Sequence, residues 1–262
     1  MNLIQAGKGC IFANSMSGFA HDTIVPDVHS TESKKKQVGG MFDSIAHRYD
    51  FLNRFLSLGI DIIWRKKAID TLRDIHPKRI LDVATGTADV AIQTVKQLQP
   101  EQIIGIDISE GMLAFGREKI QKKGLAAIIQ LETGDSEAMR FENQSFDAVT
   151  VAFGVRNFQN LRIGLSEIHR VLRPGGKLVV LEFSKPTAPV IRSFYGIYMR
   201  WLAPALGRLF SKNKTAYSYL DESIRSFPEG NAFVSVLQET GFTNTSFNRL
   251  TFGICTIYCG IK

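Results

Sequence analysis

The stretch Ile80-Leu81-Asp82-Val83-Ala84-Thr85-Gly86-Thr87-Ala88-Asp89 decides how this chain folds. Its apolar start predicts a short buried strand, which the small residues 85–87 break before helical periodicity begins. A strand that turns directly into a helix brings backbone N–H groups to a ligand at the positive end of that helix. A second apolar run ends in Asp107, where an acidic residue of a βαβ unit accepts hydrogen bonds from ribose hydroxyls. Together these features predict a site for a nucleoside-containing cofactor and leave its identity open.

Strands and helices alternate along the rest of the chain. Strands are predicted over residues 80–84, 102–106, 126–131, 145–153 and 177–183, with helices over 88–98, 109–122, 160–172 and 229–240. This alternation is typical of a parallel sheet covered on both faces. Two β-rich runs, 243–250 and 252–261, then predict a terminal hairpin that adds an antiparallel strand. The expected fold class is therefore α/β, with a mostly parallel seven-stranded sheet and an antiparallel terminal strand.

Three segments lie outside this alternation. Residues 1–38 show no sustained hydrophobic period and are interpreted as a flexible extension of a domain that spans 39–262. Apolar residues at helical spacing predict two N-terminal helices over the cofactor cleft, the second over residues 61–73 with Ile62, Ile63 and Ile69 facing inward. The third segment, residues 184–228, is interpreted as a helical lid insert.

The lid insert has no acidic residue from Ser184 to Leu220, and its basic residues alternate with aromatic and aliphatic ones. Two interpretations fit this pattern. The lid helix could expose its basic face to solvent, or it could lie flat and contact an anionic membrane surface or an apolar substrate tail.

Composition sets further bounds. The chain has 262 residues, of which 44% are hydrophobic and 22% charged, as in an ordinary globular protein. A net charge of +7 favours anionic partners only weakly, and no nucleic-acid partner is predicted. Three cysteines, no signal-peptide pattern and no long apolar stretch favour a cytoplasmic protein, with a peripheral position at the inner face of the membrane as an open alternative. The five histidines are scattered, so no metal site is predicted.

Two nucleoside cofactors compete for the predicted site. A nicotinamide dehydrogenase would carry Gly-x-Gly-x-x-Gly, but the turn after Gly86 lacks the second and third glycines. Asp82 lies inside the strand, where a carboxylate would repel a dinucleotide pyrophosphate. It could instead order the turn and reach the ammonium group of S-adenosylmethionine. The residues favour methyl transfer over redox chemistry, and a dehydrogenase remains an alternative.

Two later loops should reach the same edge of the sheet. The third strand leads to Asp135 and Ser136, which could accept from the adenine amino group. The fourth strand delivers Arg156 and Asn157 among aromatic residues. Because arginine stays protonated, Arg156 is expected to stabilise a developing phenolate and not to take a proton.

Longer motifs carry a family resemblance. They are Phe42-Asp43-x-Ile45-Ala46-x-x-Tyr49-Asp50-x-x-Asn53, Leu81-Asp82-Val83-Ala84-Thr85-Gly86-Thr87, Phe153-Gly154-Val155-Arg156-Asn157, Leu172-Arg173-Pro174-Gly175-Gly176, Leu181-Glu182-Phe183-Ser184-Lys185-Pro186 and Tyr219-Leu220-x-x-Ser223-Ile224-x-x-Phe227-Pro228. From about residue 40 to the end, the chain resembles the ubiquinone/menaquinone biosynthesis C-methyltransferase family. The resemblance implies a Rossmann-like fold that uses S-adenosylmethionine. It also implies C-methylation of a polyprenylated quinol, with demethylmenaquinol or 2-methoxy-6-polyprenyl-1,4-benzoquinol as the substrate.

The resemblance also implies roles by position. It makes Thr87 a cofactor contact, Asp107 the ribose ligand, and Asp135 with Ser136 the adenine side. Asp82 beneath the turn and Gly86 within it are also expected to bind the cofactor. Substrate and catalytic groups fall on Arg156, Asn157 and Tyr49. The general base stays open between a water polarised by Arg156, Tyr49 and His47. A non-catalytic subunit of a quinone-biosynthesis assembly remains a second alternative.

Overall fold

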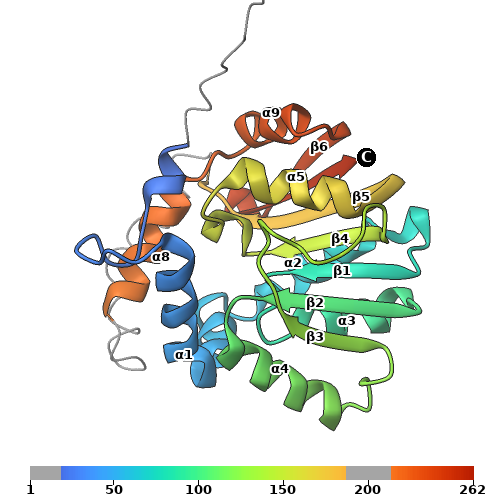
Figure 1. Cartoon of the computed structure of the whole chain (residues 1–262), viewed down its shortest axis with the longest axis horizontal. Helices are drawn as coiled ribbons and strands as arrows, with labels where there is room; N and C mark the ends of the chain where they lie inside the picture. Colours follow the sequence, from blue (N-terminus) through green and yellow to red (C-terminus); the bar gives the residue numbers. More distant parts are fainter. Residues whose placement is uncertain (1–18, 187–213) are drawn as a thin grey trace, which may run out of the picture.

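The computed structural model describes residues 19–186 and 214–262, and one sheet organises them (Figure 1). Its strand order is β3-β2-β1-β4-β5-β7-β6. The strands are β1 Arg79–Val83, β2 Gln102–Asp107, β3 Ile129–Thr133, β4 Phe146–Ala152, β5 Leu172–Phe183, β6 Thr243–Leu250 and β7 Cys255–Ile261. Within the described chain, β7 runs antiparallel to its neighbours β5 and β6, and the other paired strands run parallel. The predicted mostly parallel sheet with an antiparallel terminal strand is confirmed.

Helices cover both faces of the sheet. They are α1 Lys34–Leu56, α2 Ile60–Asp70, α3 Asp89–Leu98, α4 Glu110–Lys122, α5 Leu161–Val171, α8 Lys214–Ser226 and α9 Asn231–Glu239, with short 3₁₀ turns η1 Ala20–Thr23, η2 Arg73–Ile75, η3 Val155–Asn157 and η5 Thr251–Gly253. Successive strand residues face opposite sides. Ile80 therefore packs with α2 and α3 in one core, whereas Leu81 packs with α5 and α9 in the other.

The N-terminal boundary differs from the prediction. Helix α1 begins at Lys34, and the residues before it pack on the domain. His21 is fully buried, its carbonyl accepts a 2.7 Å hydrogen bond from the Lys34 ammonium, and Asp22 accepts from the Leu161 N–H. The interpretation of residues 1–38 as a flexible extension is thus wrong for residues 19–38. The remaining residues 1–18, and positions 187–213 of the predicted lid, lie outside the described residues.

The second helix also differs. It runs over Ile60–Asp70, and Ile69 is buried as predicted, but Ile62 and Ile63 are exposed. The side that packs inward carries Trp64, Arg65 and Ala68 instead.

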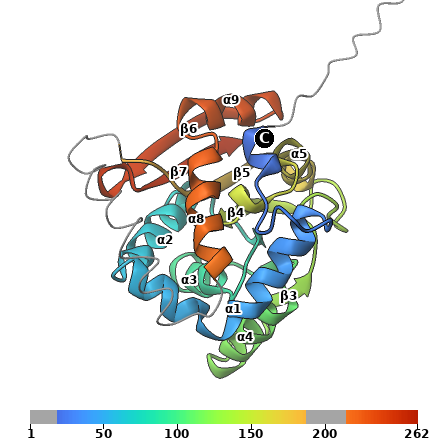
Figure 2. The same cartoon turned by 90° about the vertical axis from the view of Figure 1, so that its left-hand side faces the viewer.

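Helices α1 and α8 lie along the edge of the sheet at which the parallel strands end (Figures 1 and 2). Ligands of open α/β sheets bind outside that edge. Among the helices described, none has the length and apolar character needed to cross a bilayer.

Candidate active site

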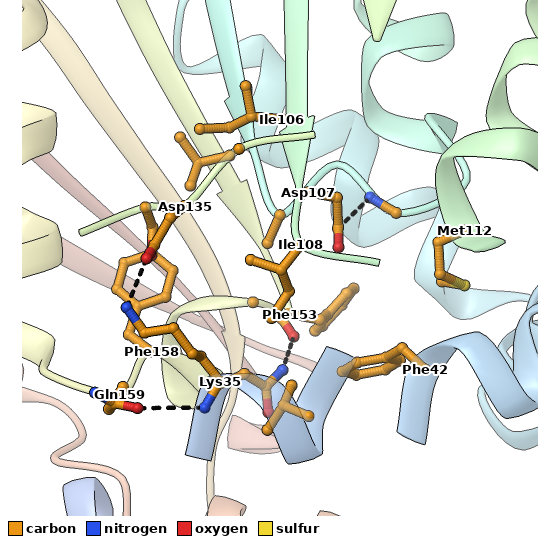
Figure 3. Close-up of a pocket in the computed structure, with 18 of the residues that line it drawn as sticks. Lys35, Phe42, Ile106, Asp107, Ile108, Met112, Asp135, Phe153, Phe158 and Gln159 are labelled. Carbon is orange, nitrogen blue, oxygen red and sulfur yellow. Dashed lines mark hydrogen bonds and ion pairs between the residues drawn. The ribbon is translucent and has the colours of Figure 1, made fainter. Parts of the chain in front are cut away.

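A cleft opens where β1, β2 and β4 end, and α1 forms its far wall (Figure 3). It encloses about 670 Å³, including the part open to solvent. The lining residues are Lys35, Val38, Phe42, Tyr49, Val83, Ala84, Gly86, Ile106, Asp107, Ile108, Met112, Gly134, Asp135, Ser136, Glu137, Ala152, Phe153, Gly154, Asn157, Phe158 and Gln159. Six of the nine predicted site residues are among them, namely Tyr49, Gly86, Asp107, Asp135, Ser136 and Asn157.

The first loop is ordered from beneath by Asp82. This buried carboxylate accepts hydrogen bonds of 2.6 Å from the hydroxyls of Thr85 and Thr150, and burial raises its pKa to about 6. Asp82 does not itself line the cleft. Of the two functions predicted for it, ordering the turn is the one that these contacts serve.

Gly86 brings the backbone of this loop to the cleft. It has a φ of +55°, and a side chain there would meet the Met112 methyl at 3.3 Å. Glycine adopts this conformation without the strain that other residues carry. A flat backbone surface is left beside Asp107, where a nucleoside could approach closely.

Asp107 lines the cleft at the end of β2. One carboxylate oxygen accepts from the Gly86 N–H at 2.8 Å and the other from the Ser109 N–H at 2.9 Å (Figure 3). Burial raises the pKa of Asp107 to about 6 although both hydrogen bonds oppose this rise. The group is therefore mostly ionised at neutral pH, and its oxygens can accept a hydrogen bond from a ligand hydroxyl.

Asp135 and Ser136 line the cleft beside β3, as predicted. Lys35 of α1 reaches across the cleft and pairs with Asp135 at 2.5 Å (Figure 3). The Asp135 carboxylate raises the pKa of Lys35. The oxygen predicted to accept from an adenine amino group is thus held by a lysine in this structure.

Tyr49 of α1 and Asn157 of η3 both line the cleft. The Asn157 amide oxygen accepts a 3.1 Å hydrogen bond from the hydroxyl of Tyr219, and its nitrogen donates to the Phe153 carbonyl. Burial raises the pKa of the Tyr49 hydroxyl above its ordinary value. Tyr49 therefore stays protonated at neutral pH and can donate a hydrogen bond.

Arg156 is not among the lining residues. Its guanidinium donates at 2.6 Å to buried Glu182 of β5 and at 2.7 Å to the Phe153 carbonyl. Its charge nevertheless acts in the cleft, because it lowers the pKa of the Tyr49 hydroxyl against the larger effect of burial. Arg156 thus acts on the cleft through its charge and is not part of the lining.

Thr87 is also not among the lining residues. Its hydroxyl donates to Asp50 of α1 at 2.5 Å, and the Lys119 ammonium bridges the two. On the same helix, Asp43 accepts from the Ser109 hydroxyl and the Gly111 N–H. In this structure the Thr87 side chain ties α1 to the loop after β1, and its cofactor contact stays a prediction.

Sequence reasoning missed several cleft residues. Lys35 was placed in the flexible extension, and Ile108, Met112 and Phe158 were given no role. The signal for Ile108, Met112 and Phe158 was position alone, since each follows the end of a strand by a few residues. Of the groups considered as general base, His47 is exposed and does not line the cleft. In the described segments, no group of three or more His, Cys, Asp or Glu side chains could hold a metal ion.

Comparisons with known proteins assign this chain to a family. Residues 30–262 match the sequence model of the ubiE/COQ5 methyltransferase family. A demethylmenaquinone methyltransferase of Bacteroides fragilis is 50% identical over 235 residues, which are 89% of this chain and 96% of that protein. A protein of Geobacter sulfurreducens named ubiquinone/menaquinone biosynthesis C-methyltransferase UbiE is 44% identical, over 87% of this chain and 90% of its own.

Solved structures agree on the fold. A methyltransferase of Thermotoga maritima, described as S-adenosylmethionine-dependent, has a TM-score of 0.60 at 16% identity and covers 85% of this chain and 99% of its own. Phosphoethanolamine N-methyltransferase 2 of Haemonchus contortus, solved with S-adenosyl-L-methionine, has a TM-score of 0.63 at 15% identity, over 89% of this chain and 60% of its own. At such identities the likeness shows the fold alone. From the family match over most of the sequence, we conclude that this chain belongs to the ubiE/COQ5 methyltransferase family.

Proposed function

We propose that this protein transfers a methyl group from S-adenosylmethionine to a ring carbon of a polyprenylated quinol, with demethylmenaquinol as its substrate. The observation that carries the proposal is the cleft, which brings the Asp107 carboxylate together with the polar side chains of Tyr49 and Asn157. The half-identical relative named for demethylmenaquinone supports the substrate. The relative named for both quinones keeps the methoxy-polyprenyl-benzoquinol as a second candidate.

The residues around Asp107 suit the nucleoside part of the cofactor. Asp107 would accept from the ribose hydroxyls, with the backbone at Gly86 in contact and Asp135 with Ser136 on the adenine side. Lys35 would have to release Asp135 for the adenine amino group to reach it. When bound, S-adenosylmethionine supplies an electrophilic methyl group.

The side chains of Tyr49 and Asn157 suit the ring. A quinol carbon becomes a good nucleophile when a neighbouring hydroxyl loses its proton, because the charge is shared with the ring. The phenolate oxygen would accept from the Tyr49 hydroxyl and the Asn157 amide, and the field of Arg156 would stabilise it. Since Tyr49 stays protonated, we propose a water as the base. Val38, Phe42, Phe153 and Phe158 add apolar side chains to the lining of the cleft, which would limit the access of other water.

A polyprenylated substrate dissolves in lipid, so the enzyme would work as a peripheral protein at the inner face of the cytoplasmic membrane. The basic, apolar composition of the lid segment supports such a contact.

The direct test is methyl transfer in vitro. Purified protein, S-adenosylmethionine with a labelled methyl group and reduced demethylmenaquinol should give labelled menaquinol by mass spectrometry. The same assay with the methoxy-polyprenyl-benzoquinol decides between the two substrates. Absence of label in both quinols would refute the proposal.

A further inference from the structure

Tyr219 of α8 is a buried tyrosine near the cleft that the proposed mechanism does not use. Helix α8 packs against η3, the turn that carries Asn157. The Tyr219 side chain lies with Val38 and Met41 of α1 in a small apolar core. Tyr219 itself is not among the residues that line the cleft. Its ring therefore contributes to the packing between α1 and α8 and not to the lining.

Packing does not account for the hydroxyl of Tyr219. A phenylalanine would fill the same apolar core without burying a polar group. A buried hydroxyl costs free energy unless a hydrogen bond compensates for the water that it loses. Its partner is Asn157, whose amide oxygen accepts from the Tyr219 hydroxyl at 3.1 Å. Burial raises the pKa of this hydroxyl above its ordinary value, so the proton stays available for the hydrogen bond at neutral pH.

Two contacts hold the Asn157 amide in one orientation. The Phe153 carbonyl can only accept a hydrogen bond, and it lies 3.4 Å from the Asn157 amide nitrogen (Figure 3). With the nitrogen on that side, the amide oxygen faces the Tyr219 hydroxyl. The contact with Phe153 is long, and the same carbonyl also accepts from Arg156 at 2.7 Å. Tyr219 therefore makes the shorter of the two contacts that orient the amide.

This orientation leaves one N–H of the Asn157 amide for a ligand. The amide nitrogen carries two hydrogens, and the Phe153 carbonyl takes one of them. In the segments that the structure describes, no group accepts from the other, and Asn157 lines the cleft. A hydrogen bond accepted by the amide oxygen also polarises the N–H groups and makes them better donors. Tyr219 thus both holds and strengthens the donor that faces a ligand.

We propose that Tyr219 is a positioning residue for methyl transfer, which acts through Asn157 and directs the amide N–H of that residue toward the quinol oxygen. The proposal rests on the proposed function for the identity of the ring. A phenolate oxygen would accept from this N–H, whereas a rotated amide would present its own oxygen and repel the negative charge. Tyr219 does not touch the substrate, so its hydroxyl should affect the reaction only while Asn157 is present.

The kinetic test is a double-mutant cycle in the full-length protein, with whichever of the two quinols the wild type methylates. Tyr219→Phe keeps the ring and should lower kcat about five- to tenfold, with the KM for S-adenosylmethionine unchanged. Asn157→Ala should lower kcat about a hundredfold. In that background, Tyr219→Phe should lower kcat by less than about twofold more, because the residue through which it acts is gone.

The matched control is Tyr258→Phe on β7. Tyr258 is also buried, its hydroxyl accepts from the Gly230 N–H at 2.8 Å, and it does not line the cleft. This variant loses one buried hydrogen bond, so it should have a lower melting temperature and keep the wild-type kcat below that temperature. An equal fall of kcat in Tyr219→Phe and Tyr258→Phe would show that lost stability slows the reaction, and it would overturn the proposal.

A measurement without turnover separates this proposal from the proposed function. In NMR spectra of isotope-labelled protein, the side-chain amide signals of Asn157 are the ones that Asn157→Ala removes. Tyr219→Phe should move these signals, and Tyr258→Phe should leave them in place. Unmoved signals in Tyr219→Phe, a wild-type kcat, or an equal loss of kcat with and without Asn157 would overturn the proposal even if the enzyme methylates quinols. Methyl transfer to neither quinol by the wild type would instead refute the proposed function, and the amide signals would still decide whether Tyr219 orients Asn157.

Discussion

Because Arg156 forms a buried ion pair with Glu182, its effect on stability can be separated from its effect on catalysis by mutating both residues. Arg156→Met removes the guanidinium and leaves the Glu182 carboxylate with only the backbone N–H groups of Phe183 at 2.9 Å and residue 156 at 3.3 Å. Leaving one partner of a buried pair uncompensated costs about 3–5 kcal/mol. For a domain of this size each kcal/mol lowers the melting temperature by about 2–4 °C, so a fall of about 6–20 °C is expected.

The double variant Arg156→Met with Glu182→Gln also removes the buried carboxylate charge that the single variant leaves without a partner. It should recover most of the lost melting temperature, measured by differential scanning calorimetry, because a neutral amide is far cheaper to bury than a carboxylate. If the field of Arg156 stabilises the phenolate, turnover of demethylmenaquinol by the double variant should remain about a hundredfold below wild type although its stability has recovered. Wild-type turnover by the double variant would refute the catalytic role, and an unchanged melting temperature in Arg156→Met would refute the structural one.

Three further predictions concern the cofactor end of the cleft. Burial raises the folded-state pKa of Asp82 from 3.8 to about 6, so its charge destabilises the native state above pH 6. In urea denaturation, Asp82→Asn should therefore stabilise the protein by up to about 3 kcal/mol at pH 7.5, and this gain should shrink towards pH 4. Lower stability of the variant at pH 7.5 would contradict this. The pKa of Asp107 is also raised to about 6, and its ionised form is the one that binds ribose hydroxyls, so the affinity for S-adenosylmethionine should fall as the pH drops below 6. In calorimetric titrations, Asp107→Asn should lower this affinity about ten- to a hundredfold at pH 7.5 and flatten its pH dependence. An affinity equal to that of the wild type would refute the ribose assignment. Lys35→Ala frees Asp135 from a partly exposed ion pair, so cofactor affinity should rise by up to about fivefold, whereas weaker binding would mean that Lys35 itself contacts the cofactor.

The sheet and the cofactor end could be predicted because their signals are local. The apolar run that ends at Val83 and the run that ends at Asp107 each specify a buried strand, and the chain order of a βαβ unit then brings Gly86 and Asp107 together. No other part of the chain has to be known for that inference.

The side-chain orientations in the rest of the site could not be predicted, because their partners are distant in sequence. Arg156 turns to Glu182, which lies 26 residues later, and Thr87 turns to Asp50, which lies 37 residues earlier. Charged runs were equally ambiguous: Lys34 belongs to a run of three lysines typical of a solvated tail, yet it is buried and burial lowers its pKa to about 8. Ile62 and Ile63 fitted the inward face of a helix by type, but Trp64 and Arg65 occupy that face.

The measurement that bears most directly on the whole account is a calorimetric titration of the purified wild-type protein with S-adenosylmethionine and, separately, with NAD⁺. A cleft with a carboxylate at Asp107 and Asp82 beneath its first loop should bind one S-adenosylmethionine per chain and should not bind the dinucleotide. Saturable binding of NAD⁺ without binding of S-adenosylmethionine would contradict the account.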